Sequence, residues 1–313
     1  MSKKVITDDI LRAKIFHASQ IIEKNLQEPL KVSQLAKKVG LSVSHFHLAF
    51  KNIVGEPVMH HILRLRVEYA AYLLKFSSWQ AGDIALVSGF YTAASFSRSF
   101  KKIMGITPQQ YRHKKCKVPF LQGYLRSRPD IPLQNKDVIT PTPTARIEEF
   151  SKMRAICLRF YGSVNDVYKP WQEILSWAKQ NISNLDNARY FGLWFDDWAY
   201  TDDDDHYRYE CAIFVPDIEQ LELPKPFFIR ELVTGPIAVA YSKGKIKNLD
   251  STWKSFAYGW LPFSGFQPRG TYVFDEYPAK FMLTSPLQKL SKLVLGQIEL
   301  NMNIPVQKDP LIC

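Results

Sequence analysis

The stretch GFYTAASFSRSFKKIMGITPQQYR, from Gly89 to Arg112, combines a turn, a helix cap and an amphipathic helix. Thr92 has the hydroxyl side chain that helix N-caps prefer. Phe96 and Phe100 lie four residues apart, so they share the buried face of the helix that follows Thr92. The opposite face carries only small, polar and basic side chains, namely Ala93, Ala94, Ser97, Arg98, Lys101 and Lys102.

A similar stretch, GLSVSHFHLAFKNIVGEP, lies about fifty residues earlier, from Gly40 to Pro57. Gly40 corresponds to Gly89 and Phe46 to Phe96, so the offset is 49 before the turn and 50 after it. Each copy predicts a short helix, a turn at glycine and a second helix. This is the pattern of a helix-turn-helix hairpin, in which the second helix enters the major groove of DNA.

In the first hairpin we expect Ser33 to cap a helix over residues 34–39, and Gly40 to end it in the left-handed conformation. Ser42 is the expected cap of the next helix. The outward polar residues of this hairpin, which we expect to contact DNA, are Ser42, Ser44, His47 and Lys51.

The segment from Pro57 to about Phe76 has apolar residues at helical spacing, including Ile62 and Leu65. It predicts a stiff helix that links the two hairpins and sets their separation, ideally one turn of DNA or about 34 Å. His61 is expected on the surface of this helix. His45 and His47 form an H-x-H pattern, but residues two apart on a helix do not share a face, so no metal site is predicted.

The excess positive charge lies in the first third of the chain. Residues 1–117 hold 19 Lys and Arg against 7 Asp and Glu, whereas residues 118–313 hold 22 against 23. A basic region joined to a neutral one favours a polyanion as the partner of the basic part. Charge alone does not separate nucleic acid from an anionic membrane, so the helical hairpins decide in favour of double-stranded DNA.

Several other classes of protein are not expected. No run of about 18 apolar residues is present, and the start MSKKVITDDI lacks the apolar part of a secretory signal, so we expect a cytoplasmic protein with no membrane partner. No nucleophile with a base and an orienting group is evident, so we expect no catalytic residue and no cofactor. The cysteines offer no zinc spacing and are expected to be reduced: Cys116, Cys157, Cys211 and Cys313.

The run RLRVEYAAYLLKFSSWQAGDIALVSGFYTAASFSRSFKKIMGITPQQYR resembles the signature of the AraC/XylS transcription regulators, over about residues 8–113. The resemblance implies that both hairpins occupy successive major grooves of one DNA segment, with RNA polymerase as a further partner. We expect Arg98 to bind guanine, which is worth about 1–3 kcal/mol of discrimination. Lys101 and Lys102 are expected to contact phosphates.

The first hairpin departs from the family at one position. Family members commonly have an arginine one position after His47, where this chain has Leu48. Leu48 either contacts DNA through its apolar side chain or packs within the protein, and the sequence leaves both alternatives open.

Prolines interrupt the chain between residues 118 and 144, and the run ITPTPT is typical of an extended connector. We therefore expect a DNA-binding domain over residues 1–117, a linker over 118–144 and a second domain over 145–313. Two helices are expected in the second domain, over 167–180 and 249–258. Strand-like runs occur at 145–150, 153–161, 209–215, 227–232, 237–241, 271–277 and 296–305, which favours an α+β domain with an antiparallel sheet and helices on one side.

The second domain also contains an internal repeat. Gly162 is nine residues before Trp171, and Gly244 is nine residues before Trp253. In each copy a strand precedes the glycine and a tryptophan-bearing helix follows it. The spacing predicts a duplicated strand–helix unit.

The runs FGLWFDDWAYTDDDDHYRYECAIFVP, IAVAYSKGKIKNLDSTWKSFAYGWLPFSGF and YVFDEYPA resemble the GyrI-like effector-binding domain, over about residues 145–307. The resemblance implies a pocket between the duplicated units for a small, often cationic, molecule. The resemblance places the family's pocket glutamate on Asp275, with Glu276 on the opposite face of the strand. A one-residue slip exchanges the two faces, so both residues stay candidates for facing the ligand. The candidate ligand-binding residues are Trp171, Trp194, Tyr209, Glu210, Trp260, Asp275, Glu276 and Tyr277.

Aromatic side chains around a buried carboxylate suit an organic cation, although rings of this kind also form ordinary cores. The leading hypothesis is a DNA-binding transcription regulator with a small-molecule effector. Two alternatives stay open: a second domain that only contacts proteins, and a GyrI-like hydrolase that uses Glu210, Asp275 or Glu276 as a base. Two reading hairpins in one chain remove the usual need for a dimer, so we expect a monomer or weak dimer.

Overall fold

The computed structural model describes residues 3–76, 79–113, 144–196, 207–216, 218, 221–245, 249–261, 264–268, 272–285, 287 and 297–308. The chain divides into two compact parts, Met1–Gly123 and Tyr124–Cys313, called here the helical domain and the sheet domain. Among the described residues, no helix is long and apolar enough to cross a membrane.

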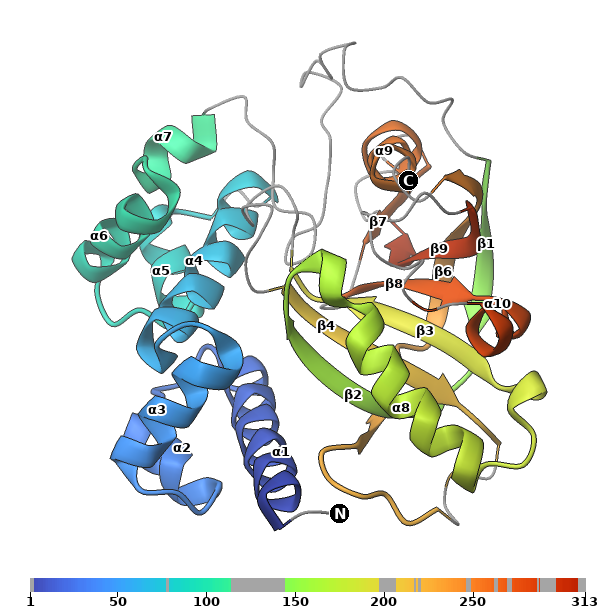
Figure 1. Cartoon of the computed structure of the whole chain (residues 1–313). Helices are drawn as coiled ribbons and strands as arrows, with labels where there is room; N and C mark the ends of the chain where they lie inside the picture. Colours follow the sequence, from blue (N-terminus) through green and yellow to red (C-terminus); the bar gives the residue numbers. More distant parts are fainter. Residues whose placement is uncertain are drawn as a thin grey trace. The chain divides into compact units, whose positions relative to one another are not determined.

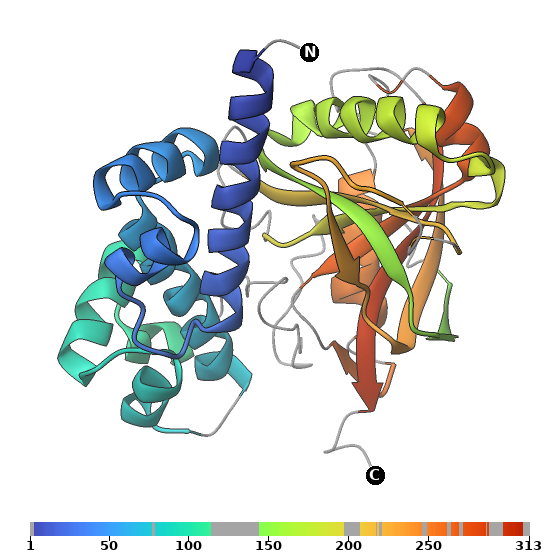
Figure 2. The ribbon, with the colours of Figure 1, turned by 90° about the horizontal axis from the view of Figure 1, so that it is seen from below.

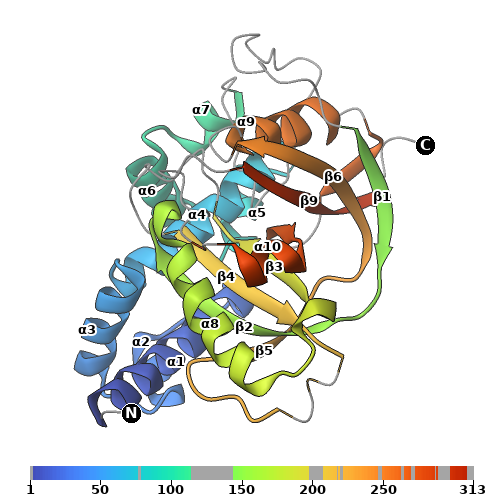
Figure 3. The same ribbon diagram turned by 45° about the vertical axis from the view of Figure 1, so that its right-hand side comes forward.

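The helical domain is built around one central helix. Its helices are α1 (Lys3–Lys24), α2 (Val32–Lys38), α3 (Val43–Val54), α4 (Val58–Phe76), α5 (Ala81–Val87), α6 (Ala93–Met104) and α7 (Pro108–His113). Both α3 and α6 pack against α4, towards its opposite ends and on the same side in Figures 1 and 3. The predicted linking helix is therefore confirmed as α4.

The two hairpins, α2 with α3 and α5 with α6, repeat each other in detail. Both first helices have seven residues, both second helices have twelve, and the second turn is one residue longer. Two predicted caps are confirmed, because the Ser42 hydroxyl accepts from the amide of His45 at 3.3 Å and the Thr92 hydroxyl accepts from that of Ser95 at 3.1 Å.

The predicted cap at Ser33 is wrong. Helix α2 begins at Val32, and Lys31 occupies the N-cap position without a side-chain hydrogen bond. The carbonyl of Lys31 accepts the first helical hydrogen bonds, from the amides of Gln34 and Leu35, so Ser33 already lies within the first turn.

Phenylalanine pairs anchor the second helix of each hairpin. The rings of Phe46 and Phe50 lie 5.6 Å apart between centroids, and those of Phe96 and Phe100 lie 5.5 Å apart. All four side chains are buried. Their burial fixes which face of α3 and of α6 turns outward.

Two left-handed glycines at the ends of helices differ in their surroundings. A Cβ on Gly89 would lie 2.6 Å from the carbonyl oxygen of Leu26 and 2.7 Å from Nε of Arg66, whereas a Cβ on Gly105 would meet nothing within 4 Å. Nε of Arg66 donates to that carbonyl at 2.9 Å. An added side chain at residue 89 therefore breaks a contact between α4 and the segment after α1.

We expect Gly105→Ala to lower the free energy of unfolding of the helical domain by about 1 kcal/mol, the cost of a left-handed alanine. Gly89→Ala should cost about 2 kcal/mol, because the hydrogen bond from Arg66 is also displaced. Urea unfolding of both variants measures this difference. Equal losses would show that the close approach at residue 89 has no energetic consequence.

The sheet domain contains a nine-stranded antiparallel sheet. Its strands are β1 (Ala145–Phe150), β2 (Arg154–Gly162), β3 (Arg189–Trp194), β4 (Tyr207–Phe214), β5 (Phe228–Glu231), β6 (Gly235–Lys245), β7 (Phe266–Pro268), β8 (Val273–Tyr277) and β9 (Gln297–Lys308). The helices are α8 (Tyr168–Asn181), α9 (Leu249–Lys254), which continues as a π-helix over Ser255–Trp260, and α10 (Ala279–Thr284). Short 3₁₀ turns occur at Val164–Asp166 and Leu185–Asn187.

The strand order shows the predicted duplication. The order β1-β6-β9-β8-β3-β4-β2-β5 reads symmetrically about the central pair β8 and β3. The first half of the sheet domain is β2, α8, β3 and β4, and the second half is β6, α9, β8 and β9. Trp171 of α8 and Trp253 of α9 occupy matching places in the two halves.

The helices cover one face of the sheet. Helix α8 runs along this face in Figure 2, and Figure 3 shows α8 and α10 in front of β3 and β4. Trp171 of α8 and Trp253 of α9 reach Tyr209 and Asp275, which share this face. The opposite face holds a hydrophobic core that includes Phe191 and Phe274.

Candidate nucleic-acid interface and effector site

The outward face of α6 is exposed at every predicted position. The buried Phe96 and Phe100 turn the remaining residues outward, and N-capping by Thr92 fixes where the helix begins. The exposed residues are Ala93, Ala94, Ser97, Arg98, Lys101 and Lys102. One arginine and two lysines therefore lie on one surface with small residues that allow close approach.

The outward face of α3 is also exposed but chemically different. Ser42, Ser44, His47 and Lys51 are all exposed. Leu48 is 61 % exposed, so packing within the protein, one of its two alternatives, is wrong. This face combines one lysine with hydroxyl, imidazole and apolar groups.

His61 is not on the surface of α4, as expected, but fully buried. Its ring packs against Phe50 with 5.4 Å between centroids, and its Nδ1 lies 2.7 Å from a carboxylate oxygen of Glu56. Arg64 donates to the same oxygen at 2.7 Å. Burial alone would raise the pKa of Glu56, but the hydrogen bond of His61 and the charge of Arg64 hold this pKa well below its usual range.

No group of three or more His, Cys, Asp or Glu side chains in the described ranges is arranged to hold a metal ion. Cys157 and Cys211 are buried free thiols, whereas Cys116 and Cys313 lie outside the described residues.

In the sheet domain, Asp275 is the centre of a buried polar cluster. The indole nitrogens of Trp194 and Trp253 donate to its two carboxylate oxygens, at 2.9 and 3.1 Å, and the Tyr277 hydroxyl donates at 3.3 Å. These four residues are called here the Asp275 cluster. Burial raises the pKa of Asp275 to about 6, although the three donors act in the opposite direction.

The cluster joins the two halves of the sheet domain. Trp194 comes from β3 of the first half, whereas Trp253 of α9 and Asp275 of β8 come from the second. Trp194 is partly exposed, and the other three members are buried. Trp194 is therefore the member of the cluster that solvent reaches.

More aromatic groups surround the Asp275 cluster. The Tyr209 ring lies 4.5 Å from that of Trp194 between centroids, and its hydroxyl accepts from the indole of Trp171 at 2.8 Å. A Cβ on Gly192 would overlap this hydroxyl, so a side chain at residue 192 would exclude Tyr209 from its place. Burial raises the pKa values of Tyr209 and Tyr277 well above normal, so both hydroxyls stay protonated as donors. Trp260 is the last residue of the π-helix that follows α9. Its ring packs against that of Phe256, with 5.6 Å between the two centroids.

Glu210 lies on the opposite face of the sheet from Asp275. It is fully buried, and it accepts from Nε of Arg159 at 2.7 Å and from Nε of Arg230 at 2.6 Å. The Arg159 guanidinium also lies over the ring of Phe195 at 4.7 Å. The structure therefore does not bring Glu210 to the Asp275 cluster, and two arginines already neutralise its charge.

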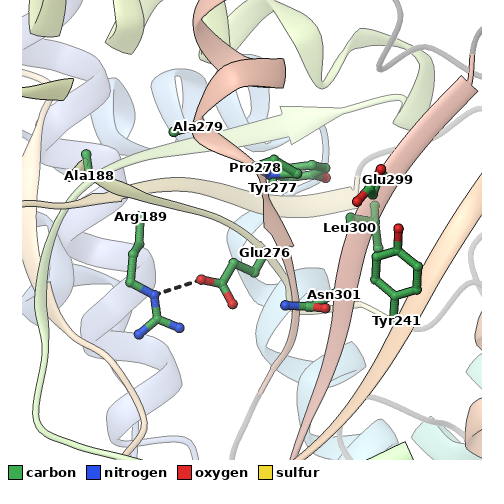
Figure 4. Close-up of a pocket in the computed structure, with 10 residues that line it drawn as sticks. All are labelled: Ala188, Arg189, Tyr241, Glu276, Tyr277, Pro278, Ala279, Glu299, Leu300 and Asn301. Carbon is green, nitrogen blue, oxygen red and sulfur yellow. Dashed lines mark hydrogen bonds and ion pairs between the residues drawn. The ribbon is translucent and has the colours of Figure 1, made fainter. Parts of the chain in front are cut away.

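Glu276 lies on the same face of the sheet as Glu210, but on β8, whereas Glu210 lies on β4. Figure 4 shows its carboxylate directed at Arg189, whose Nε donates to it at 2.7 Å. The two side chains line a pocket of about 260 Å³ with Tyr241 and Asn301. The sequence left Asp275 and Glu276 as alternatives. In the structure Asp275 bonds Trp194 and Tyr277, whereas Glu276 bonds Arg189 and shares its pocket with Tyr277.

Sequence reasoning missed several residues of these sites. Trp253 was not selected as a ligand-binding residue, although its match with Trp171 in the repeat could have indicated it. Arg159, Arg189 and Arg230 were also missed. Arg159 interrupts an apolar strand, ICLRFYG, and a charged residue at such a position indicates a buried ionic partner.

Comparison with known proteins identifies both domains. The profile of the GyrI-like small molecule binding domain matches residues 143–291, and the profile of a helix-turn-helix domain matches residues 35–114. The first range contains the Asp275 cluster. The second contains α3 and α6, the second helices of the two hairpins, called here the reading helices.

Two curated relatives are each similar to about a third of the chain. YkgA of Escherichia coli K12, named as an HTH-type transcriptional regulator, is 34% identical over 113 residues, which are 36% of this chain and 47% of that protein. An uncharacterized HTH-type transcriptional regulator of Staphylococcus aureus is 36% identical over 111 residues, 36% of this chain and 14% of that protein. The chain thus spans about half or less of the length of these curated relatives.

Among solved structures, the C-terminal domain of the two-component response regulator yesN from Fusobacterium nucleatum is 33% identical, with a TM-score of 0.30. That similarity covers 31% of this chain and 94% of the other. On the two profile matches, the chain joins a helix-turn-helix domain of the AraC type to a C-terminal GyrI-like small-molecule-binding domain.

Proposed function

We propose that this protein is a sequence-specific, DNA-binding transcription regulator that responds to a small organic cation. The observation that carries the first part is the pair of matching hairpins, each with an exposed polar and basic face on its second helix. Both helices pack on α4, so one chain can present two reading helices to one duplex.

The outward residues of α6 divide into two roles under this proposal. Arg98, near the middle of the helix, reads a guanine through two hydrogen bonds. Lys101 and Lys102 in the last turn neutralise phosphates, which gives affinity without sequence information. Affinity should therefore fall steeply as the salt concentration rises.

Arg98→Ala should weaken binding to the preferred duplex by about 5- to 150-fold, corresponding to about 1–3 kcal/mol, and relax the preference for guanine at one position. Lys102→Ala is the matched control, since it removes charge from the same helix face. It should weaken binding to all sequences alike and reduce the salt slope by about 1. Fluorescence anisotropy with matched and mutated duplexes measures both effects. An Arg98→Ala variant with unchanged sequence preference would show that another surface reads DNA.

The second part of the proposal rests on the Asp275 cluster. A carboxylate buried among indole and phenol rings suits an organic cation, which gains both charge pairing and contact with aromatic faces. A cation that reaches Asp275 would replace the indole N–H of the partly exposed Trp194. Binding should therefore change the fluorescence of the sheet domain's tryptophans.

Asp275→Asn should weaken the binding of a responsive organic cation by about 30-fold or more, because it removes the charge that the ligand pairs with. Glu276→Gln is the control, since Glu276 lies on the opposite face. A calorimetric titration of the full chain with a panel of aromatic and quaternary ammonium cations measures this. Loss of affinity in the Glu276 variant alone would move the site to the pocket beside Arg189.

No heat with any cation would favour a sheet domain that contacts proteins instead. RNA polymerase is the proposed protein partner, and a monomer or weak dimer is the proposed state on DNA. A hydrolytic role receives no support from Glu210, whose charge is already neutralised by Arg159 and Arg230.

A further inference from the structure

The reading helices of the two hairpins correspond residue by residue. Both α3 and α6 have twelve residues, start after a capping hydroxyl and end at a left-handed glycine. The constant offset of 50 pairs Lys51 with Lys101 and Leu48 with Arg98. In the first hairpin, a leucine therefore occupies the place that an arginine holds in the second.

Nothing in the fold of the hairpin accounts for a leucine here. The apolar face of α3 is complete without it, because Phe46, Ala49 and Phe50 are buried against the rest of the helical domain. Leu48 is 61 % exposed and lies between the exposed polar residues Ser44 and Lys51, one turn away on either side. Leu48 thus lies among polar residues in the middle of this face, which also exposes Val43 at the first residue of α3.

We propose that Leu48 contacts the C5-methyl group of a thymine, so that the two hairpins recognise chemically different half-sites. This inference rests on the proposed DNA-binding function. Leucine has no hydrogen-bonding group, and the thymine methyl is the apolar feature that a base pair presents in the major groove. The guanidinium of Arg98 instead matches the two acceptors of guanine.

The surroundings of Leu48 favour DNA over a protein as its occupant. Lys51 lies one turn further along the same face and matches Lys101, so both helices carry a cation at the same distance from the central position. A protein-binding patch would be expected to be more apolar, with fewer charges at its centre. The same place on α6 carries Arg98, which a common apolar partner would not accept.

The test uses a duplex obtained by selection with the full chain, in which deoxyuridine replaces each thymine in turn. Deoxyuridine lacks only the methyl group. Replacing the contacted thymine should weaken binding about fourfold, which corresponds to about 0.8 kcal/mol for one methyl group returned to water. Leu48→Ala should bind the thymine and deoxyuridine duplexes equally. Leu48→Arg should acquire a preference for guanine at this position.

Leu86→Ala is the control, because Leu86 is also 61 % exposed but lies on α5, outside the reading helices. It should retain the full sensitivity to the methyl group. Tight binding that no deoxyuridine weakens, or sensitivity that persists in Leu48→Ala, would overturn the inference and leave the proposed function intact. Failure of the chain to bind any duplex would overturn both.

Discussion

Glu210→Gln is expected to lower the free energy of unfolding of the sheet domain by about 3–5 kcal/mol, the cost of breaking a buried ion pair from one side. The glutamate is fully buried, and so is Arg159, while Arg230 is 20% exposed in its side chain. Glutamine keeps the shape of the side chain but removes the negative charge that faces both guanidinium groups.

Glu231→Gln is the matched control for Glu210→Gln. Glu231 pairs with Lys152 at 3.0 Å, but both side chains are more than half exposed, at 54% and 67%. Exposed pairs contribute about 0–1 kcal/mol, so this variant should unfold close to the wild type. Urea unfolding followed by tryptophan fluorescence gives both values. A loss below 1 kcal/mol for Glu210→Gln would show that the buried cluster does not need its negative charge.

The second large effect concerns pH and Asp275. Burial raises its folded-state pKa to about 6, above the ordinary value of 3.8. Between these two values the folded state binds the proton and the unfolded state does not, so stability falls as the pH rises from about 4 to about 6. The free energy of unfolding falls by about 3 kcal/mol over this range, and it does not recover above pH 6.

Other carboxylates also make stability depend on pH. Comparing the wild type with an Asp275→Asn variant isolates the contribution of Asp275. Asp275→Asn should remove it, so the stability of the variant relative to the wild type should rise by about 3 kcal/mol between pH 4 and pH 7.5. Asp186→Asn, at an exposed position of the same domain, should leave the profile unchanged. A wild type and an Asp275→Asn variant with parallel pH profiles would contradict a buried, destabilising carboxylate.

The sequence predicts the helical domain well because its signals are local. Caps at Ser42 and Thr92 and phenylalanines four residues apart define the reading helices within a dozen residues. The one wrong cap, Ser33, reflects the competition between adjacent residues for the first position of a short helix. His61 was misplaced because its burial depends on Phe50 and Glu56, which a helical pattern on α4 alone does not include.

The sheet domain is harder to predict because its contacts connect distant residues. Strand β3 was missed because a glycine, Gly192, stands in the middle of its short run. Glu210 meets Arg159 across 51 residues, and only the register of β2 with β4 brings them together. On β8, Asp275 and Glu276 are separated because neighbouring residues of a strand face opposite sides of the sheet.

The central claim is that two hairpins of one chain read successive major grooves of one duplex. The most direct test compares a selected duplex, with half-sites centred about 10 base pairs apart, with the same duplex carrying five inserted base pairs. The insertion turns one groove to the opposite side of the helix. Affinity should then drop to that of a duplex with a single half-site. Equal affinity for the two duplexes would contradict the claim.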